Sequence, residues 1–197
     1  KQAIVSRLSS IEELAGMNIL CSDKTGTLTK NELTLYTPYL IDGNTEVDLM
    51  MSAALSAKRM SSGQDAIDKC ITEHAGSMNG VKLDEWEEIS FIPFDPVRKR
   101  TESTVKNTRT GESMECCKGA PQVILALSSN LAEIKDDIER EVNNFASRGF
   151  RTLGVARKHQ GEWVMQGLLS LFDPPRDDTF STIKKARHMN IHVKMIT

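Results

Sequence analysis

The chain has 197 residues, of which 39% are hydrophobic and 26% charged, and its formal net charge is −2. This composition is typical of an ordinary globular protein and lacks the basic excess expected of a nucleic-acid-binding one, so we expect no nucleic-acid partner. No apolar stretch approaches the roughly 20 residues that a membrane-spanning helix needs. The chain opens on Lys-Gln-Ala without an apolar leader, so we expect no secretory signal, and because it lacks an initiator Met we expect a piece of a longer protein.

The first elements in chain order are a strand, a loop and two helices. Residues 17–21 (MNILC) are a short apolar run that predicts a buried strand, and the Gly and Thr residues after it predict a loop. Apolar side chains at helical spacing predict a helix over 46–57 and a second, shorter helix over 65–74.

The middle of the chain changes to strands. Residues 86–117 contain β-prone segments separated by turn residues, which predicts an antiparallel meander. Pro121 suits the first turn of the helix that follows. The clearest helix covers 131–148, where Asn130 and Glu133 predict a capping box and Gly149 predicts the end.

The last part of the chain returns to an alternation of strand and helix. Strands are predicted over 152–156 and 163–171, before the break at 173–175 (DPP). A helix over 178–189 and an apolar strand over 191–196 complete the chain. Since α+β structure in the middle separates strand–loop at the front from helix–strand at the back, we predict an inserted domain.

The four cysteines are Cys21, Cys70, Cys116 and Cys117. Their spacing matches no zinc site, and we interpret them as reduced thiols. Because neighbouring residues of a strand point to opposite faces, Cys116 and Cys117 should lie on the two sides of a sheet.

Asp23 carries the chemistry suggested by the sequence. It follows the first predicted strand, at the end of the strand where α/β sheets place their sites, and a carboxylate there can form an aspartyl-phosphate. Donors for the phosphoryl oxygens follow at once: Lys24, the Gly26 N–H and the hydroxyls of Thr25 and Thr27. A Mg²⁺ ion would bridge the remaining oxygens. The alternative is an Asp that merely caps a loop.

The stretch 22–29 (SDKTGTLT) resembles the phosphorylation motif of the P-type ATPases, cation pumps that pass through an aspartyl-phosphate. Other stretches resemble further signatures of the family, in the family's order: 118–121 (KGAP), 148–156 (RGFRTLGVA) and 173–178 (DPPRDD). The stretches most similar to the plasma-membrane proton pumps are 10–29, 64–68, 91–101 and 167–179.

The resemblance implies an α/β fold in two domains. A partial Rossmann-like phosphorylation domain of the haloacid-dehalogenase type would comprise residues 1–32 and the truncated segment 173–197. An inserted α+β nucleotide-binding domain with an antiparallel sheet would comprise 33–172. The resemblance also implies a place at the cytoplasmic face of the plasma membrane. The partners would be the transmembrane and actuator domains of the same pump.

The resemblance also assigns roles around Asp23, which would be the phosphorylated nucleophile with Lys24, Thr25 and Thr27 beside it. Asp23 and Thr25 would bind Mg²⁺, together with carboxylates from a later segment of the family that this chain lacks. Related phosphatases carry a second Asp at the position of Thr25. Because threonine does not shuttle protons near neutral pH, the phosphoenzyme should hydrolyse slowly.

ATP would be the nucleotide, although no Walker A pattern is present. Phe94 matches the aromatic residue on which adenine stacks; the alternative is a core phenylalanine, the role expected of Phe91. Lys118 matches the lysine at the bottom of the adenine pocket. Gly119 would let the ligand approach the backbone.

Further family positions would surround the nucleotide. Arg151 would reach the phosphates, and Lys99 would lie near them or else in a solvated turn. Asp65 would accept a hydrogen bond from the adenine amino group, with Asp68 as the alternative acceptor.

The hinge between the domains is a separate group of family positions. Asp173 matches the hinge acid, followed by the stiffening prolines of DPPR. Arg176 would join the hinge contacts to the nucleotide or else be a surface arginine. Thr197 keeps the first residue of a later nucleotide-binding motif.

Three alternatives to a proton pump stay open. The chain could be a soluble phosphohydrolase of the haloacid-dehalogenase type, against which Thr25 and the KGAP segment argue. It could be a nucleotide-binding module without catalysis, or part of a pump for another cation such as Ca²⁺.

Overall fold

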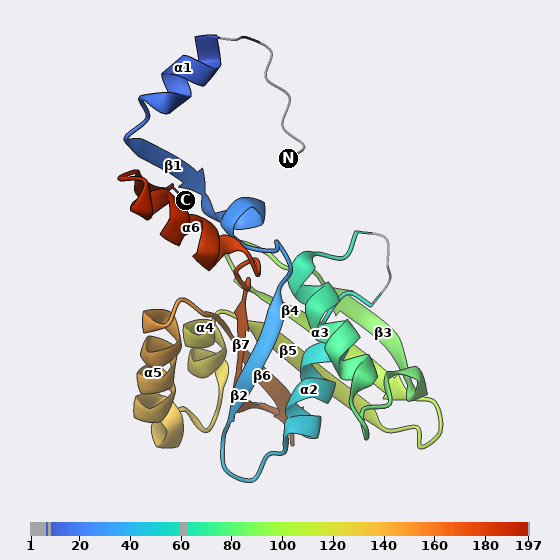
Figure 1. The fold of residues 1–197 in the computed structure, drawn as a ribbon. Helices are drawn as coiled ribbons and strands as arrows, with labels where there is room; N and C mark the ends of the chain where they lie inside the picture. The colour runs from blue at the N-terminus through green and yellow to red at the C-terminus, as the bar shows by residue number, and fades with distance from the viewer. Residues whose placement is uncertain (1–6, 8, 60–62, 197) are drawn as a thin grey trace. The chain divides into compact units, whose positions relative to one another are not determined.

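The computed structural model describes residues 7, 9–59 and 63–196. The chain divides into two compact units, one formed by residues 1–32 and 173–197 and the other by residues 33–172. We call them the terminal unit and the central unit (Figure 1). None of the described helices has the length and apolar character needed to cross a bilayer.

The terminal unit contains two strands that pair in parallel, β1 with β8. Its elements are α1 (Ser9–Ala15), β1 (Ile19–Asp23), the short helical loop η1 (Lys24–Leu28), α6 (Thr179–His188) and β8 (His192–Ile196). The strand expected at 17–21 is present, but the prediction that it is buried was wrong, because Ile19 is 47% exposed. A two-stranded sheet and the short helices of this unit cannot cover both faces of β1.

The central unit is built on a six-stranded sheet in the order β2-β7-β6-β5-β4-β3, antiparallel throughout. Its strands are β2 (Thr34–Leu40), β3 (Trp86–Ile92), β4 (Arg100–Asn107), β5 (Ser113–Gly119), β6 (Arg151–His159) and β7 (Glu162–Phe172). Its helices are α2 (Glu46–Leu55), α3 (Ala66–Ser77), the 3₁₀ turn η2 (Leu83–Glu85), α4 (Pro121–Leu127) and α5 (Leu131–Ser147). The meander predicted over 86–117 is confirmed as β3, β4 and β5.

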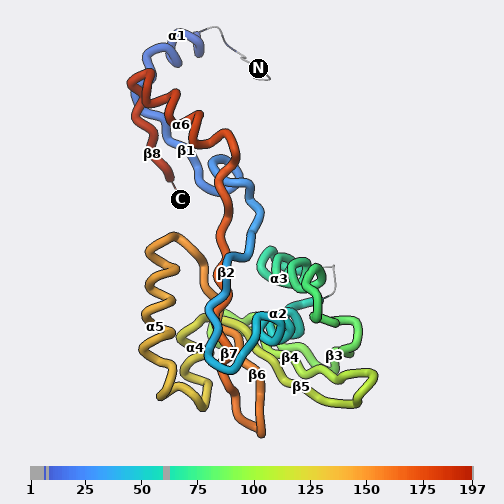
Figure 2. Tube along the Cα trace, turned by 60° about the horizontal axis from the view of Figure 1, so that its bottom comes forward, coloured from blue at the N-terminus to red at the C-terminus, as the bar shows by residue number. Residues whose placement is uncertain are grey.

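Helices cover both faces of this sheet (Figure 2). One core cluster packs α4 and α5 on the sheet, and the others pack α2 and α3 on the opposite face. Cys117 belongs to the first cluster and Cys116 to the opposite face, which confirms the expected alternation. Burial raises the pKa of both thiols to about 12, and all four cysteines are free, as predicted.

The ends of α5 show which local signals were reliable. Gly149 has φ of +80°, and the Phe150 N–H donates to the Phe145 carbonyl at 3.0 Å, so the predicted glycine stop is confirmed. The predicted capping box was wrong, because the Asn130 side chain makes no bond to the helix start. It bonds instead to the N–H and carbonyl of Met165, both at 3.1 Å, and so tethers α5 to β7.

Candidate functional site

The central unit contains a cavity of about 400 Å³, within the range typical of small-molecule sites. Its lining comes from α3, the segment between β3 and β4, the β5–α4 junction and β6. Five residues expected at a nucleotide line it: Asp65, Phe94, Lys99, Lys118 and Gly119. The fold therefore brings together side chains that lie far apart in the sequence.

Phe94 lines this cavity with 58% of its surface exposed, so the alternative of a core phenylalanine was wrong. Phe91 is half-buried but belongs to none of the three core clusters, so its expected core role was also wrong. An exposed aromatic side chain in a cavity wall is available for stacking against a flat ligand.

Lys99 lies in a tightly bonded turn before β4. The Asp95 carboxylate accepts the N–H groups of Val97 and Arg98 at 2.9 and 2.8 Å. Lys99 follows with φ of +50°, and its carbonyl accepts the Ala120 N–H at 3.0 Å. The side chain is exposed, as a solvated turn requires, and it also lines the cavity.

Gly119 is required by the close approach of this turn. A Cβ at Gly119 would lie 2.3 Å from the Lys99 carbonyl oxygen and 2.6 Å from the Arg100 Cβ. The sequence predicts that the missing side chain gives a ligand access to the backbone. That reason was wrong, because the protein's own chain occupies the space.

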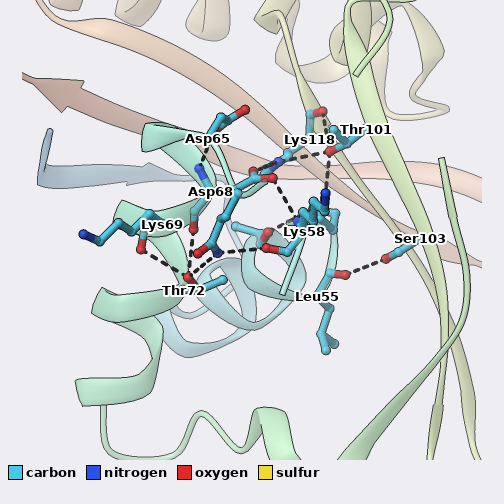
Figure 3. A network of polar contacts seen from close by, with 12 residues as sticks. Leu55, Lys58, Asp65, Asp68, Lys69, Thr72, Thr101, Ser103 and Lys118 are labelled. Carbon is cyan, nitrogen blue, oxygen red and sulfur yellow. Dashed lines mark hydrogen bonds and ion pairs between the residues drawn. The ribbon is translucent and has the colours of Figure 1, made fainter. Parts of the chain in front are cut away.

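Lys118 and Asp68 form a buried ion pair in the cavity wall (Figure 3). Their residues are 4% and 5% exposed, and Lys118 Nζ lies 2.6 Å from Asp68 Oδ1. Lys118 Nζ also donates to Thr101 Oγ1 at 3.0 Å. Because both charges are buried, removing either partner would leave the other uncompensated.

Two acids are candidates for accepting the amino group of a bound adenine, and their surroundings differ. Asp65 is exposed and begins α3 by accepting the Asp68 N–H at 2.8 Å. Asp68 already accepts from Lys118 and, at 2.9 Å, from the Lys58 N–H. The geometry therefore favours Asp65 as the acid available to a ligand.

Arg151 is placed beside the cavity lining without belonging to it. It is exposed and begins β6, and its neighbours Thr152 and Leu153 line the cavity. The direct contact expected of Arg151 thus stays a prediction.

Asp23 ends β1 in the terminal unit and is exposed, with the Lys24 N–H donating to its Oδ1 at 2.8 Å. The chain turns at Gly26, where φ is +78°. The Gly26 N–H, expected among the phosphoryl donors, donates to Thr29 Oγ1 at 3.2 Å, so it is not free in this conformation. The Thr29 hydroxyl in turn donates to Asp173 Oδ2 at 2.5 Å.

Other predicted residues of the terminal unit lie around this loop. Asp173 also accepts the Glu32 N–H at 3.3 Å and so joins the two segments of the unit. Thr25 is exposed, and Thr27 lines a separate cavity of about 260 Å³ between β1 and α6. Arg176 also lines this cavity, and its Nε lies 3.7 Å from Asp178 Oδ1. Thr197 lies outside the described residues.

Comparison with known proteins decides the family. The sequence model for "P-type ATPase, cytoplasmic domain N" matches residues 10–178. The chain belongs to the P-type ATPase family. Within the part of the chain that the structure describes, no group of three or more His, Cys, Asp or Glu residues is arranged to hold a metal ion.

Curated relatives and solved structures agree with this assignment. The P-type ATPase chain is 47% identical to Plasma membrane ATPase 1 of Saccharomyces cerevisiae over 204 residues, covering 100% of the chain and 22% of that protein. It is 43% identical to the Plasma membrane ATPase of Neurospora crassa, again covering 22% of that protein. It thus spans about a fifth of the length of these relatives.

The fold is shared more widely than the sequence. One crystal structure of a zinc-transporting PIB-type ATPase superposes with a TM-score of 0.68 at 19% identity, covering 96% of this chain and 27% of that one. A second structure of a zinc-transporting PIB-type ATPase, in another state, gives a TM-score of 0.65 at 18% identity with the same coverage.

Two residues of the candidate site were missed or misjudged from sequence. The sequence indicates Asp68 only as an alternative acceptor for adenine, and it indicates no role for Thr101. Thr101 and Lys118 are direct partners in the β4–β5 register, so an exact hairpin register would have placed them together. The ion pair from α3 to β5 left no local signal, because its two residues are 50 positions apart in sequence.

Proposed function

We propose that this chain is the ATP-binding and phosphorylated part of a P-type pump of the proton-pumping kind. The central unit is its nucleotide-binding domain. The terminal unit supplies two segments, 1–32 and 173–197, of a phosphorylation domain of the Rossmann-like, haloacid-dehalogenase type. The parallel pairing of β1 with β8 across α6 supports such a fold.

One observation carries the nucleotide proposal: Asp65, Phe94, Lys99, Lys118 and Gly119 line a single cavity. Adenine stacks on Phe94 and meets the Lys118 ammonium, while Asp65 accepts from its amino group. The cavity is lined mainly by apolar groups, which suits a flat base better than a phosphate chain.

The phosphates of the nucleotide require cations near the open side of such a site. Lys99 is exposed at the cavity, and Arg151 is exposed beside its lining. Arg151 binds phosphate oxygens through its planar guanidinium, while Lys99 contributes a compact charge. Asp173 serves as the hinge acid, and its hydrogen bonds to Thr29 and Glu32 link the two segments of the chain that connect the units. In the longer protein, Thr197 begins a further nucleotide-binding motif.

Asp23 is the nucleophile. A carboxylate oxygen of Asp23 forms a bond to the γ-phosphorus of ATP, and the bond from that phosphorus to the β,γ-bridging oxygen breaks. ADP leaves with the bonding electron pair, and Asp23 becomes an acyl phosphate. Lys24, Thr25 and Thr27 donate to the phosphoryl oxygens. Because Thr25 cannot act as a general base near neutral pH, the acyl phosphate persists.

Mg²⁺ suits the oxygen ligands that Asp23 and Thr25 offer, and when bound it neutralises phosphoryl charge. The described residues hold no cluster of three acidic or imidazole ligands. They therefore supply only part of the ligand set of such an ion.

In the whole protein, formation and loss of the phosphoenzyme switch the membrane part between two states, in which the ion site opens to opposite sides of the membrane. The partners are the transmembrane and actuator domains of the same pump, at the cytoplasmic face of the plasma membrane. The proton is the proposed ion because residues 10–29, 64–68, 91–101 and 167–179 resemble the plasma-membrane proton pumps, and the curated relatives are named plasma membrane ATPases. A pump for another cation is the alternative.

The test is a phosphorylation assay on the longer pump that contains this chain. Incubation with γ-labelled ATP should give acid-stable, hydroxylamine-labile label that is absent from Asp23→Asn. The matched control Asp42→Asn, in the central unit, should keep the label. Unlabelled protein that steadily releases phosphate from small phosphate esters would instead indicate a phosphohydrolase.

A further inference from the structure

Asp68 is the centre of a closed polar network in the cavity wall of the central unit (Figure 3). Its Oδ1 contacts Lys118 Nζ at 2.6 Å, and its Oδ2 accepts the Lys58 N–H at 2.9 Å. Its own N–H donates to Asp65 at 2.8 Å. A single carboxylate thus joins β5, the segment after α2 and the first turn of α3.

This network fixes the Lys118 ammonium. An ammonium has three N–H donors, and in the described part of the chain two of them have partners, Asp68 and the Thr101 hydroxyl. The backbone of Lys118 is held between Thr101 on β4 and Val155 on β6. A ligand in the cavity therefore meets one oriented donor rather than a freely moving lysine.

We propose that Asp68 is the positioning residue of the nucleotide site: it neutralises and orients Lys118, and it determines affinity for the base through Lys118 rather than by touching the nucleotide. This inference rests on the proposed function. Orienting the donor in advance spares the entropy that a free lysine would lose on binding.

The surroundings of Asp68 separate this role from direct contact. Asp68 is 5% exposed, and each of its two oxygens already accepts a bond from the protein. Asp65 lines the same cavity, is exposed, and has the carboxylate that a ligand can reach. The two acids thus have different roles: Asp65 contacts the ligand, and Asp68 orients Lys118.

The experiment measures dissociation constants of the full chain by calorimetry for two magnesium-bound probes. One is ATP, and the other is purine riboside triphosphate, which lacks the amino group of adenine. The variants are Asp68→Asn, Lys118→Met and the double variant. Asp68→Asn keeps the shape of the side chain but removes the charge that pairs with Lys118.

We expect each single substitution to weaken both probes by roughly 10- to 100-fold, since each removes the oriented charge. The double variant should bind no more weakly than Lys118→Met, because without the lysine there is nothing left to orient. Asp65→Asn should weaken ATP but not the probe without the amino group.

Three results would overturn the proposal. Weakening by Asp68→Asn that is confined to ATP would show that Asp68 contacts the amino group itself. Losses that multiply in the double variant would show two independent roles. An unchanged dissociation constant in Asp68→Asn would leave Asp68 a purely structural residue. Failure of the unsubstituted chain to bind either probe would instead refute the proposed function.

Two controls separate an effect on binding from an effect on folding. Asp48→Asn removes another acid from the first turn of a helix in the same unit, where its carboxylate accepts the Thr45 N–H. We expect it to lower stability and leave both dissociation constants unchanged. If Asp68→Asn lacks a cooperative urea transition, Lys118→Met and the double variant still decide. Equal binding supports the proposal, and a further loss confined to ATP contradicts it.

Discussion

The central and terminal units differ in how they hold their functional residues. The central unit places its candidate cavity against a sheet with buried clusters on both faces. In the terminal unit, Thr29 is the one buried residue among those described, and apolar side chains such as Phe180 and Met189 are 79% and 71% exposed. Asp23 therefore lies on a strand with little core behind it.

A chemical motif and the packed structure that supports it are therefore separable features of this chain. The residues around Asp23 are consecutive in sequence, so they stay close to one another without extensive packing. The cavity exists only because α3, β5 and the turn before β4 are packed together. Measurements of exchange, stability and binding test this contrast between the two units.

Hydrogen exchange should separate the units most strongly. Amides of β5, β6 and β7 lie in the middle of a covered six-stranded sheet, whereas those of β1 and β8 belong to an exposed two-stranded pair. We expect β1 and β8 to exchange roughly a thousandfold faster, measured by mass spectrometry of the full chain. Equal protection in both units would contradict the contrast.

Truncation of a core side chain should matter only in the central unit. Leu169 is 1% exposed, so Leu169→Ala should lower the free energy of unfolding by about 2–5 kcal/mol. The control Met195→Ala, at a residue that is 56% exposed, should change it by less than about 0.5 kcal/mol. Urea denaturation measures both, and similar losses would show that β8 is packed as tightly as β7.

Gly119→Ala should damage the cavity wall. The added methyl group would meet the Lys99 carbonyl, so we expect a loss of about 1–3 kcal/mol in stability and weaker ATP binding. Gly76 lies within α3 with open space at its Cβ position, so Gly76→Ala should be neutral or slightly stabilising. Unfolding midpoints and calorimetry provide the comparison, and a neutral Gly119→Ala would refute the close approach.

Alkaline pH should destabilise the central unit through its buried thiols. The pKa of Cys116 rises from 9.0 to about 12 because burial disfavours the thiolate. The fold thus favours the protonated thiol, and its stabilising contribution is complete below pH 9 and is lost as the pH rises through about 12.

Urea titrations at pH 8 and pH 10 measure this loss, which should be about 1 kcal/mol per buried thiol. The decline should shrink in Cys116→Ala. It should be unchanged in Cys21→Ser, because Cys21 is exposed in the terminal unit. An identical decline in Cys116→Ala would contradict the assignment.

Sequence predicted most of the elements because their signals are local, although it gave no prediction for α1 or β2. Apolar spacing located α2, α3 and α5, Pro121 marked the start of α4, and Gly149 ended α5. The failures came from competition by distant groups. Asn130 was expected to cap α5, but its side-chain amide bonds instead to the N–H and the carbonyl of Met165 on β7. The prediction that β1 is buried failed because the apolar character of a strand does not show which elements cover it.

The candidate site was predictable in its residues and not in its contacts. The resemblance led to Phe94, Lys99 and Lys118, all of which line one cavity. The Asp68–Lys118 ion pair depends on how α3 packs against β5, which no pattern in the sequence reports. The reason for Gly119 was likewise tertiary, since the atoms that exclude a side chain belong to Lys99 and Arg100.

The most direct measurement is a magnesium–ATP titration of the ¹⁵N-labelled chain by NMR. We predict saturable shifts for the amides of Thr101, Lys118 and Gly119, with the same shifts in Asp23→Asn and a titration midpoint roughly 10- to 100-fold higher in Lys118→Met. Nucleotide binding would then belong to the central unit. Shifts confined to the terminal unit, with the cavity amides silent at saturation, would contradict this account.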